Sequence, residues 1–531
     1  MKYDVVIVGA GHNGLVCGAY LAKAGLNVCV VERRPLVGGA CATEEVWPGY
    51  KVSTAAHMLG LLQPRVILDL DLQKFGYEVL ATPPIVQPLA GAGPVVLWRE
   101  TDRLAQQLAR FSAKDAAAYP RYVEHLAAVG PIFRQLMWEI PFDPSVMSAG
   151  NLRDMAMFAW RNRQMIGRFS DVTDLLTMSA YDYLSRWFES DAALAIFGYY
   201  PAGGSGQSVG FHTAGTAYFL LRGQLRDNNT PAGGTGLVRG GMGAVTAAMQ
   251  RSGESHGMET RLGAEVTRIL VKDGKAQGVA LANGDEIRAN LVVSNASARH
   301  TFLNLVEDGA LPGDFLDRLR GFGGRATAFK VHLAVRELPR LEGIEASGFG
   351  PGEPSQVTIA PSVAWLEQAF ADLQAGMPSR RPYLTVQAPS VVDPTLAPPG
   401  HHLMSIYGGH IPSGPDADHG EATKDAVTAR VIDTIRQFAP TWSGEYLHRH
   451  VMLSADYEAQ FGLPGGNPHH ADLNLSQLFF RRPVPGYANH GTPVRDLYLC
   501  SASNHPGGGV TGVPGYNAAR VLLRHLGRGR P

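Results

Sequence analysis

Hydrophobic residues along this chain follow two patterns, which predict two kinds of element. Continuous β-branched runs at Val5–Val8 and Val28–Val31 are typical of strands that are buried on both faces of a parallel sheet. Between residues 103 and 195, apolar residues recur at helical spacing. The expected helices cover residues 104–111, 119–137, 155–166 and 172–188. The chain therefore combines a parallel sheet with a largely helical region, as α/β proteins do.

The second half of the chain returns to strand patterns. The expected elements are a helix at 244–250, two strands joined at Asp273–Gly274, a third after the turn at Asn283–Gly284, a short buried strand from Leu291, and strands at 327–335 and 382–387. Loops rich in proline and glycine fill much of the remainder.

A glycine turn joins the first strand to a helix. Gly9, Gly11 and Gly14 follow the first strand, and Glu32 follows the second. In such a unit the glycines allow a tight turn, a close approach of the backbone to a pyrophosphate, and close packing of helix on strand. The Glu32 carboxylate can accept both ribose hydroxyls and disfavours a 2′-phosphate, so FAD or NAD fits better than NADP. The alternative is an ordinary strand–helix turn with chance glycines.

The residues after the second strand favour FAD over NAD. Arg34 precedes Gly38, Gly39 and Ala40 at a spacing that resembles the Arg-x-x-x-Gly-Gly extension of FAD enzymes of the two-dinucleotide-binding-domain group. This resemblance implies that the paired glycines bring backbone N–H groups to the pyrophosphate and that the arginine lies close to it. Arg33 is counted with this group. The alternative for both arginines is a pair of solvated charges in a loop.

A second strand–loop–helix unit lies near the C-terminus. A strand at 497–500 leads into a glycine-rich loop at 501–512, and Pro514 suits the first turn of the helix that follows. The N-terminal end of this helix, with Gly509 and Val510 before it, can stabilise an anionic acceptor such as the N1–C2=O edge of a reduced flavin.

Composition narrows the range of partners. Of the 531 residues, 45% are hydrophobic and 18% are charged, and the formal net charge is zero, so no nucleic-acid partner is expected. No run of about eighteen apolar residues predicts a spanning helix. The glycine turn follows Met1 closely, so we expect no signal peptide and a cytoplasmic protein.

Cysteine, histidine and glycine spacings exclude other classes of site. The four cysteines form no C-x-x-C pair, which argues against a disulfide reductase. Histidines at 401–402, 448–450 and 469–470 lie in loop-like stretches without partners at zinc spacing, so we expect no metal site and interpret them as surface or substrate-domain residues. Glycine runs at 203–206 and 233–236 do not open a helix after a β-branched strand, so no dedicated NAD(P) domain is expected.

Three blocks give the chain a more specific resemblance. They are the run from Gly38 to Ser53, the runs 461–467 and 477–486, and the loop Asn504–Val510, and they span nearly the whole chain. They resemble the phytoene (carotenoid) desaturase family of FAD enzymes, and more closely its pyridine nucleotide-disulfide oxidoreductase domain-containing branch. The resemblance implies bound FAD and a β-meander in which Val266 meets the adenine through its backbone. Asn295, at the end of the neighbouring strand, is counted as a further cofactor-binding residue.

The resemblance also implies an architecture. We expect an α/β fold with a Rossmann-like FAD-binding domain of the two-dinucleotide-binding-domain flavoprotein type, a mixed-sheet substrate domain and a helical insertion. The expected segments are residues 1–90, 226–300 and 489–531 for the FAD-binding domain, 91–225 for the helical, substrate- or membrane-facing region, and 301–488 for the substrate domain. The run 155–166 mixes large apolar side chains with arginines, so it is a candidate for peripheral membrane contact or an apolar tunnel, with core packing as the alternative.

The expected activity is that of an FAD-dependent oxidoreductase acting on C–C bonds. It would desaturate, saturate or isomerise an apolar small molecule of polyene-like or lipid-like character. Oxygen or a quinone is the expected external electron acceptor, and an oligomer is compatible with the sequence. Two other functions stay open: a flavin amine oxidase, and a non-catalytic interaction protein stabilised by FAD.

Two histidines are the candidate acid–base residues. His57 and His505 lie in blocks expected beside the isoalloxazine ring, and histidine titrates near neutrality. Loop histidines bonded to the backbone are the alternative. Six aromatic residues are candidate walls for an apolar substrate, with plain core packing as the alternative: Tyr199, Tyr200, Phe211, Phe219, Phe479 and Phe480.

Overall fold

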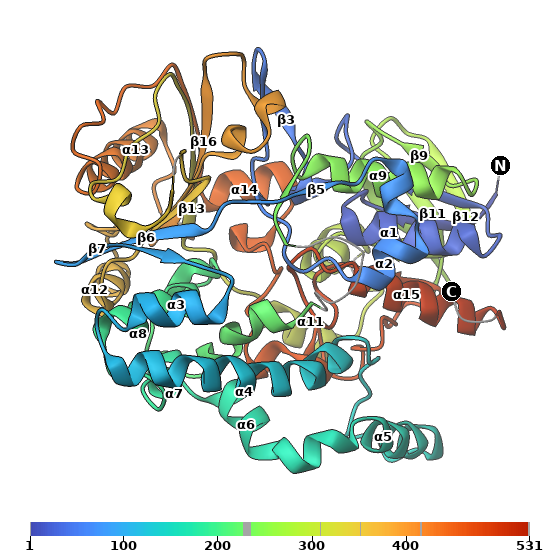
Figure 1. Cartoon of the computed structure of the whole chain (residues 1–531). Helices are drawn as coiled ribbons and strands as arrows, with labels where there is room; N and C mark the ends of the chain where they lie inside the picture. The colour runs from blue at the N-terminus through green and yellow to red at the C-terminus, as the bar shows by residue number, and fades with distance from the viewer. Residues whose placement is uncertain (1, 227–234, 308, 351, 415–416, 529–531) are drawn as a thin grey trace.

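Two mixed β-sheets organise the chain, and helices from separate parts of the sequence cover them (Figure 1). The computed structural model describes residues 2–226, 235–307, 309–350, 352–414 and 417–528. Within these residues each large sheet has seven strands. The predicted α/β fold, with a nucleotide-binding sheet and a mixed second sheet, is confirmed.

The first sheet brings three distant segments of the chain side by side. Its order is β10-β11-β12-β1-β2-β9, and β18 pairs with β12. β1 is parallel to β2 and β12, so that Val5 lies opposite both Val28 and Leu291. The bounds are β1 Tyr3–Val8, β2 Val28–Val31, β9 Glu259–Arg261, β10 Val266–Lys272, β11 Lys275–Leu281, β12 Glu286–Ser294 and β18 Leu497–Leu499. The predicted strands are confirmed, although the third meander strand and the buried strand from Leu291 form one strand, β12.

Both faces of this sheet are buried, as the continuous apolar runs predict. Val5 and Ile7 pack into one hydrophobic cluster, and Val6 and Val8 pack into another on the opposite face. The first cluster includes residues of α1 (His12–Lys23), α9 (Gly243–Glu254) and α15 (Val513–His525). α9 and α15 each pack against α1, so the C-terminal helix lies beside the N-terminal one (Figure 1). The predicted helix at 244–250 is confirmed as part of α9.

The second sheet has the order β17-β13-β16-β15-β14-β6-β7. Its pairs are antiparallel except that of β14 with β6. The bounds are β6 Ile85–Leu89, β7 Gly93–Leu97, β13 Ala328–Val335, β14 Gln356–Ile359, β15 Tyr383–Gln387, β16 His402–Gly409 and β17 His448–Met452. The strands predicted at 327–335 and 382–387 are confirmed. The boundary expected at residue 90 falls inside the β6–β7 hairpin, whose two strands both belong to this sheet.

Helices cover the region between residues 101 and 198. Their bounds are α3 Thr101–Leu108, α4 Ala113–Met137, α5 Ala149–Arg161, α6 Phe169–Thr177, α7 Ala180–Leu184 and α8 Asp191–Gly198. The first three predicted helices correspond to α3, α4 and α5. The single helix predicted over 172–188 is wrong. Met178 is extended, and the Ser179 hydroxyl caps α7 by accepting a hydrogen bond from the backbone N–H of Asp182 at 3.0 Å.

The helix α5 lies on the surface rather than in the core. No residue of α5 is buried, and beyond its end Ile166 is 79% exposed, while Trp160 within it is 62% exposed. Phe158 and Met165 are partly buried against the core of the helical region, so the run 155–166 packs one side on the core, and its contact with a membrane surface stays a prediction. None of the helices in the described ranges is long and apolar enough to cross a membrane.

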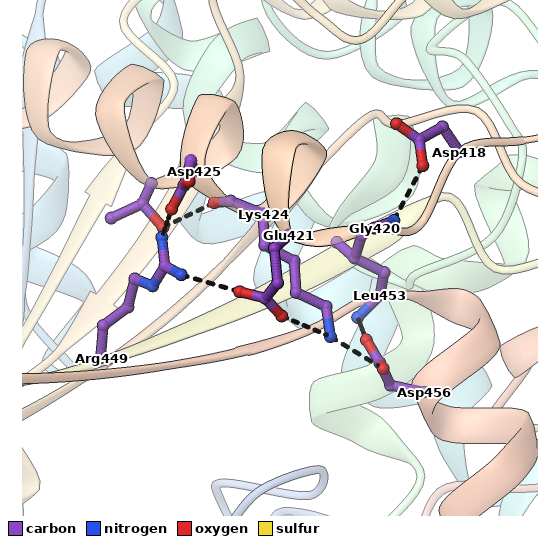
Figure 2. A network of polar contacts seen from close by, with 9 residues as sticks. Asp418, Gly420, Glu421, Lys424, Asp425, Arg449, Leu453 and Asp456 are labelled. Carbon is purple, nitrogen blue, oxygen red and sulfur yellow. Dashed lines mark hydrogen bonds and ion pairs between the residues drawn. The ribbon is translucent and has the colours of Figure 1, made fainter.

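Charged side chains tie α13 (Glu421–Arg436) and α14 (Ser454–Phe461) to β17 (Figure 2). The Lys424 ammonium lies 3.0 Å from a carboxylate oxygen of Asp456 and 3.7 Å from one of Glu421. Arg449 of β17 pairs with Glu421 and Asp425. The other helices and strands are α2 Pro64–Asp69, α10 Ala298–His300, α11 Gly313–Arg320, α12 Val363–Gln374, β3 Glu44–Trp47, β4 Tyr50–Val52, β5 Val79–Leu80 and β8 Leu237–Val238.

Candidate functional site

The turn between β1 and α1 is closed in a way that only glycine allows. Gly9 has a φ of 93°, a left-handed conformation that favours glycine. A Cβ on Gly14 would lie 2.3 Å from the carbonyl oxygen of Gly9, and a Cβ on Gly11 would lie 2.8 Å from the side-chain nitrogen of Asn295. The turn that leads into α1 therefore has no side chains at these positions, as a phosphate-binding turn requires.

Glu32 holds its carboxylate beside this turn. The residue is 7% exposed, and its two oxygens accept hydrogen bonds from the backbone N–H of Ala10 at 2.9 Å and of Arg34 at 3.0 Å. Carboxylate oxygens have further lone pairs for other donors. Position and remaining acceptor capacity both fit the two hydroxyls of a ribose.

The two arginines of the extension point to different partners. The Arg34 Nη2 atom lies 2.6 Å from a Glu44 oxygen, and the guanidinium stacks over the Phe461 ring at 5.1 Å. The Arg34 Nη1 atom is buried and has no hydrogen-bond partner among the described residues. Arg33 instead donates to the carbonyls of Ala459 and Gln460 at the end of α14, at 2.9 and 3.0 Å. Arg34 thus keeps a donor for a pyrophosphate, whereas Arg33 fastens α14 to the nucleotide-binding sheet.

The glycine pair lies directly against the turn. Gly38 has a φ of 121°, and its N–H donates to the Ala10 carbonyl at 2.8 Å. A Cβ on Gly39 would lie 3.5 Å from the Gly11 Cα. The Ala40 carbonyl accepts a hydrogen bond from the backbone N–H of Ala56 at 2.9 Å. The pair and the glycine turn Gly9–Gly14 together form one glycine cradle, and the pair also places the residues around Ala56 next to it.

Val266 and Asn295 lie on either side of the cradle. Val266 begins β10, and the Ala264 N–H before it donates to the Glu32 carbonyl at 2.8 Å, so β10 starts next to the acid. The Asn295 amide donates to the Gly9 carbonyl at 3.2 Å. Asn295 thereby fixes the glycine turn, and the roles of both residues toward a cofactor stay predictions.

The C-terminal loop meets the same region from the other side. Gly509 and Val510 have φ values of 116° and 54°, and a Cβ on Gly509 would lie 2.8 Å from the Leu61 side chain. Gly515, in the first turn of α15, would place a Cβ only 2.3 Å from the Asn13 carbonyl oxygen. The N-terminal ends of α1 and α15 therefore lie against each other, so residues 9–14 and 509–515 form parts of one site.

His505 is buried and His57 is partly exposed, and the pKa of each imidazole lies below its ordinary value. The His505 Nε2 donates to the Leu136 carbonyl at 2.8 Å, its Nδ1 has no partner among the described residues, and burial lowers its pKa to about 4. Burial holds the pKa of His57 well below its ordinary value, and the charge of Arg222 lowers it further. The imidazole of His505 joins α4 to the C-terminal loop. Catalytic roles for the two histidines stay predictions.

Lys330 is a candidate that the sequence reasoning missed. It lies on β13, is fully buried, and its Nζ donates to the carbonyls of Ser53 and Ala55 at 2.7 and 2.9 Å. Burial holds the pKa of its amine well below the ordinary value. The signal was a lysine inside the apolar run Ala328–Val335, every residue of which is buried. A fully buried lysine is rare and often has a functional role.

Lys330 lies on a polar face of the second sheet. His332, two residues along β13, is on the same face and lies opposite Ser405, which lies opposite Gln387. The Ser405 hydroxyl and the side-chain oxygen Oε1 of Gln387 are buried without a partner among the described residues. The Gln387 amide is 3.9 Å from the Met58 sulfur, so this face points toward the segment that Lys330 contacts. A bound molecule there would find unused hydrogen-bonding groups.

Two sequence interpretations of histidines need correction. His448 and His450 lie in β17 and His402 begins β16, so these positions are strands rather than loops. His469 and His470 are each 8% exposed and are not surface residues, because they pack under the C-terminal loop, where burial lowers their pKa values to about 4 and about 3. In the part of the chain that the structure describes, no three His, Cys, Asp or Glu side chains form a metal cluster.

The candidate aromatic walls divide between cavity and core. A cavity of about 40 Å³ beside the C-terminal loop is lined by Tyr200, Phe219, Gly508 and Thr511 among others. Phe211 is 1% exposed within the core of the helical region, where plain packing explains it. A larger cavity of about 970 Å³ lies between the end of α4, α5 and α15, and none of the predicted site residues lines it. The glycine run at 203–206 belongs to a helical turn after α8, and Gly233 and Gly234 lie outside the described residues.

Comparisons with known proteins identify the family. Residues 14–522 match the family described as flavin containing amine oxidoreductase. The rat pyridine nucleotide-disulfide oxidoreductase domain-containing protein 2 is 36% identical over 549 residues, which cover 99% of this chain and 94% of the rat protein. A limonene dehydrogenase polypeptide from Castellaniella defragrans is 26% identical, with 99% and 95% of the two chains covered. A lycopene-forming phytoene desaturase from Paracoccus sp. is 24% identical, with 98% and 97% covered.

Solved structures show the same fold at low identity. A triple mutant of putrescine oxidase superposes with a TM-score of 0.61 at 14% identity, covering 99% of this chain and 98% of that one. The bare backbone of the glycine turn, the spare acceptors of Glu32 and the unpartnered Nη1 of Arg34 fit the ribose and pyrophosphate of FAD. The chain belongs to the flavin containing amine oxidoreductase family, it is an oxidoreductase, and its cofactor is FAD.

Proposed function

We propose that this flavoprotein changes the saturation of a carbon–carbon bond in a largely apolar substrate. The observation that carries the proposal is the cavity at the C-terminal loop, where Tyr200, Tyr218 and Phe219 stand across from Gly508 and Thr511. Apolar walls exclude water from a C–H bond that is to be broken. The relatives named limonene dehydrogenase and phytoene desaturase support this reaction class.

Lys330 is our candidate for moving a proton, although it does not itself line this cavity. Bound FAD supplies a two-electron acceptor for a C–H bond. Removal of a second hydrogen as a proton needs a base from the protein. The two carbonyls of Ser53 and Ala55 engage both hydrogens of a neutral Lys330 amine and leave its lone pair free. We therefore assign Lys330 as the base, with His57 as a nearby imidazole.

Amine oxidation is the second candidate, supported by the family description and by the fold of putrescine oxidase. An ammonium substrate is best received by a carboxylate. Among the described residues that line the cavity there is no Asp or Glu, and the permanent charge there is the cation of Arg222. A like charge disfavours an ammonium group, so we place amine oxidation behind carbon–carbon chemistry.

Anaerobic mixing separates the two classes. The purified yellow protein is mixed under argon with phytoene, with limonene and with benzylamine, and the flavin absorbance is followed. We expect bleaching by an alkene and none by the amine, and a product that differs from its alkene by two hydrogens. Rapid bleaching by benzylamine, with hydrogen peroxide formed on admission of air, would overturn the proposal.

The electron acceptor is proposed to be a quinone or oxygen. Protein reduced by light under argon is mixed with air-saturated buffer or with a soluble quinone, and the return of the flavin absorbance is timed. Faster return with the quinone would identify the quinone as the acceptor. The oligomeric state is measured on the same preparation by size-exclusion chromatography with light scattering.

A further inference from the structure

Arg222 is a cation in an otherwise apolar cavity. It lies near the end of the 3-10 helix Thr216–Gln224, which follows the helical region. The cavity that it lines, of about 40 Å³, is otherwise formed by aromatic, aliphatic and neutral polar residues, and it opens on the loop that carries Gly508 and Thr511. His469 also lines it, but burial lowers the pKa of that imidazole to about 4, so it carries no charge at neutral pH.

The guanidinium of Arg222 has no polar partner within the described ranges. Its contact is the face of the Tyr200 ring, 4.2 Å from the guanidinium carbon. The contrast is Arg482, also in this part of the molecule, which donates to the carbonyls of His469, Asp472, Gln477 and Ala502. The fold thus satisfies an arginine that has a structural role. Arg222 is only partly buried, and its planar fork of donors has no protein acceptor among the described residues.

The charge of Arg222 acts on two nearby histidines. It contributes, after burial, to the low pKa values of His57 and His469. An apolar cavity with one cation on its wall favours a ligand that joins one negative charge to a hydrocarbon body.

We propose that Arg222 anchors the carboxylate of an otherwise apolar substrate. The inference rests on the proposed function and names the substrate class for the same site. A carboxylate accepts two parallel hydrogen bonds from one guanidinium, and a single fixed cation matches its single charge. A cavity of about 40 Å³ holds a few water molecules, so it has room for the carboxylate, and the hydrocarbon must extend out of it.

Three ligands with one hydrocarbon chain test the anchor. Farnesoic acid, farnesol and farnesylamine are titrated into the FAD-loaded protein, and binding is followed by the perturbation of the flavin spectrum and by calorimetry. We expect the acid to bind about tenfold or more tightly than the alcohol, and the amine to bind most weakly. Equal affinities of acid and alcohol would overturn the proposal, and this comparison needs no variant.

Substitutions then assign the preference to Arg222. The variant Arg222→Met should lose the preference for the acid while keeping its affinity for farnesol, and Arg222→Lys should keep part of it, because a lysine retains the charge but not the fork. Arg163→Met is the matched control, since Arg163 also stacks on an aromatic ring, that of Trp160 at 5.3 Å, but lies on the surface. An acid preference that survives Arg222→Met, in protein with a normal FAD content, would overturn the proposal.

The outcomes for the anchor and for the proposed function are distinct. Tight binding of farnesoic acid without bleaching by any alkene would support the anchor and reject the carbon–carbon chemistry. Turnover of phytoene or limonene, together with equal binding of acid and alcohol, would support the chemistry and reject the anchor.

Discussion

Two lysines on opposite sides of β17 show how the same side chain serves two purposes. Lys424 of α13 is 17% exposed and lies between the carboxylates of Glu421 and Asp456 (Figure 2). Lys330 of β13 lies opposite Met452 of β17, is fully buried, and bonds only to backbone carbonyls.

The two lysines differ in the chemical groups that they contact. Carboxylates compensate a charge, so Lys424 can help to hold α13, α14 and β17 together. Carbonyl groups do not compensate the loss of water around a charge, so burial lowers the pKa of Lys330 and favours the neutral amine. The first lysine fastens the second sheet from outside, and the second is the base that we propose within it.

The largest expected effect is on turnover by Lys330→Met. With an alkene that bleaches the flavin, the single-turnover rate should fall by about 10²–10⁴-fold, because the proton acceptor is gone. The FAD content should be unchanged, since Lys330 does not contact the glycine cradle. Lys424→Met is the matched control and should keep its rate. Equal losses in the two variants would remove the distinction between the lysines.

A smaller effect is expected for His57→Gln. The ring lies beside Tyr407, with 5.6 Å between centroids, and is close enough to Lys330 for the two groups to interact electrostatically. We expect a rate loss of about tenfold in the same assay. His505→Gln is measured alongside. If His505→Gln slowed bleaching more than His57→Gln did, at equal FAD content, the base would lie at the C-terminal loop instead.

The free energy of unfolding should depend on pH because of Lys330. The folded protein holds this amine neutral, whereas the unfolded chain binds a proton there below the ordinary value of about 10.5. The unfolded state therefore binds more protons, so the wild-type free energy of unfolding gains up to about 1.4 kcal/mol per pH unit as pH rises from the folded pKa toward about 10.5.

Chemical denaturation at several pH values measures this slope. The difference between wild type and Lys330→Met should shift in favour of wild type as pH rises, and added salt should leave that shift unchanged because the site is buried. A difference that stays flat between neutral pH and about pH 10 would mean that Lys330 is charged in the folded protein.

The smallest expected effect is the change in stability caused by Lys424→Met. Lys424→Met should lower the free energy of unfolding by about 1 kcal/mol or less, because the Glu421 side chain with which it pairs is 74% exposed. The loss should shrink in high salt. A large loss that salt does not reduce would show that the ion pairs with Glu421 and Asp456 behave as a buried unit.

Local signals explain what could be predicted from the sequence. The strands at Val5–Val8 and Val28–Val31 and the glycine turn depend on neighbours within a few residues, and the structure has them at the expected places. The break before α7 was also local, but Ser179 as a helix cap was hidden in a run of helical spacing.

Features that depend on long-range pairing were not predicted. β6 pairs with β14, so Val86 lies opposite Val357. No local pattern predicts a partner strand so far along the chain. Burial of Lys330 likewise follows from Ser53 and Ala55 closing over β13. Lysine is usually exposed, so only the assembled fold distinguishes this one from a surface residue.

The most direct test of the account is the stoichiometry of a single anaerobic turnover. Purified protein of known FAD content is mixed with an excess of an alkene that bleaches it, and the products are quantified by mass spectrometry. The account predicts one product molecule per flavin reduced, with two hydrogens fewer than its alkene and with none formed by Lys330→Met on the same time scale. Full bleaching by an amine, or bleaching by an alkene without a product that has lost two hydrogens, would contradict it.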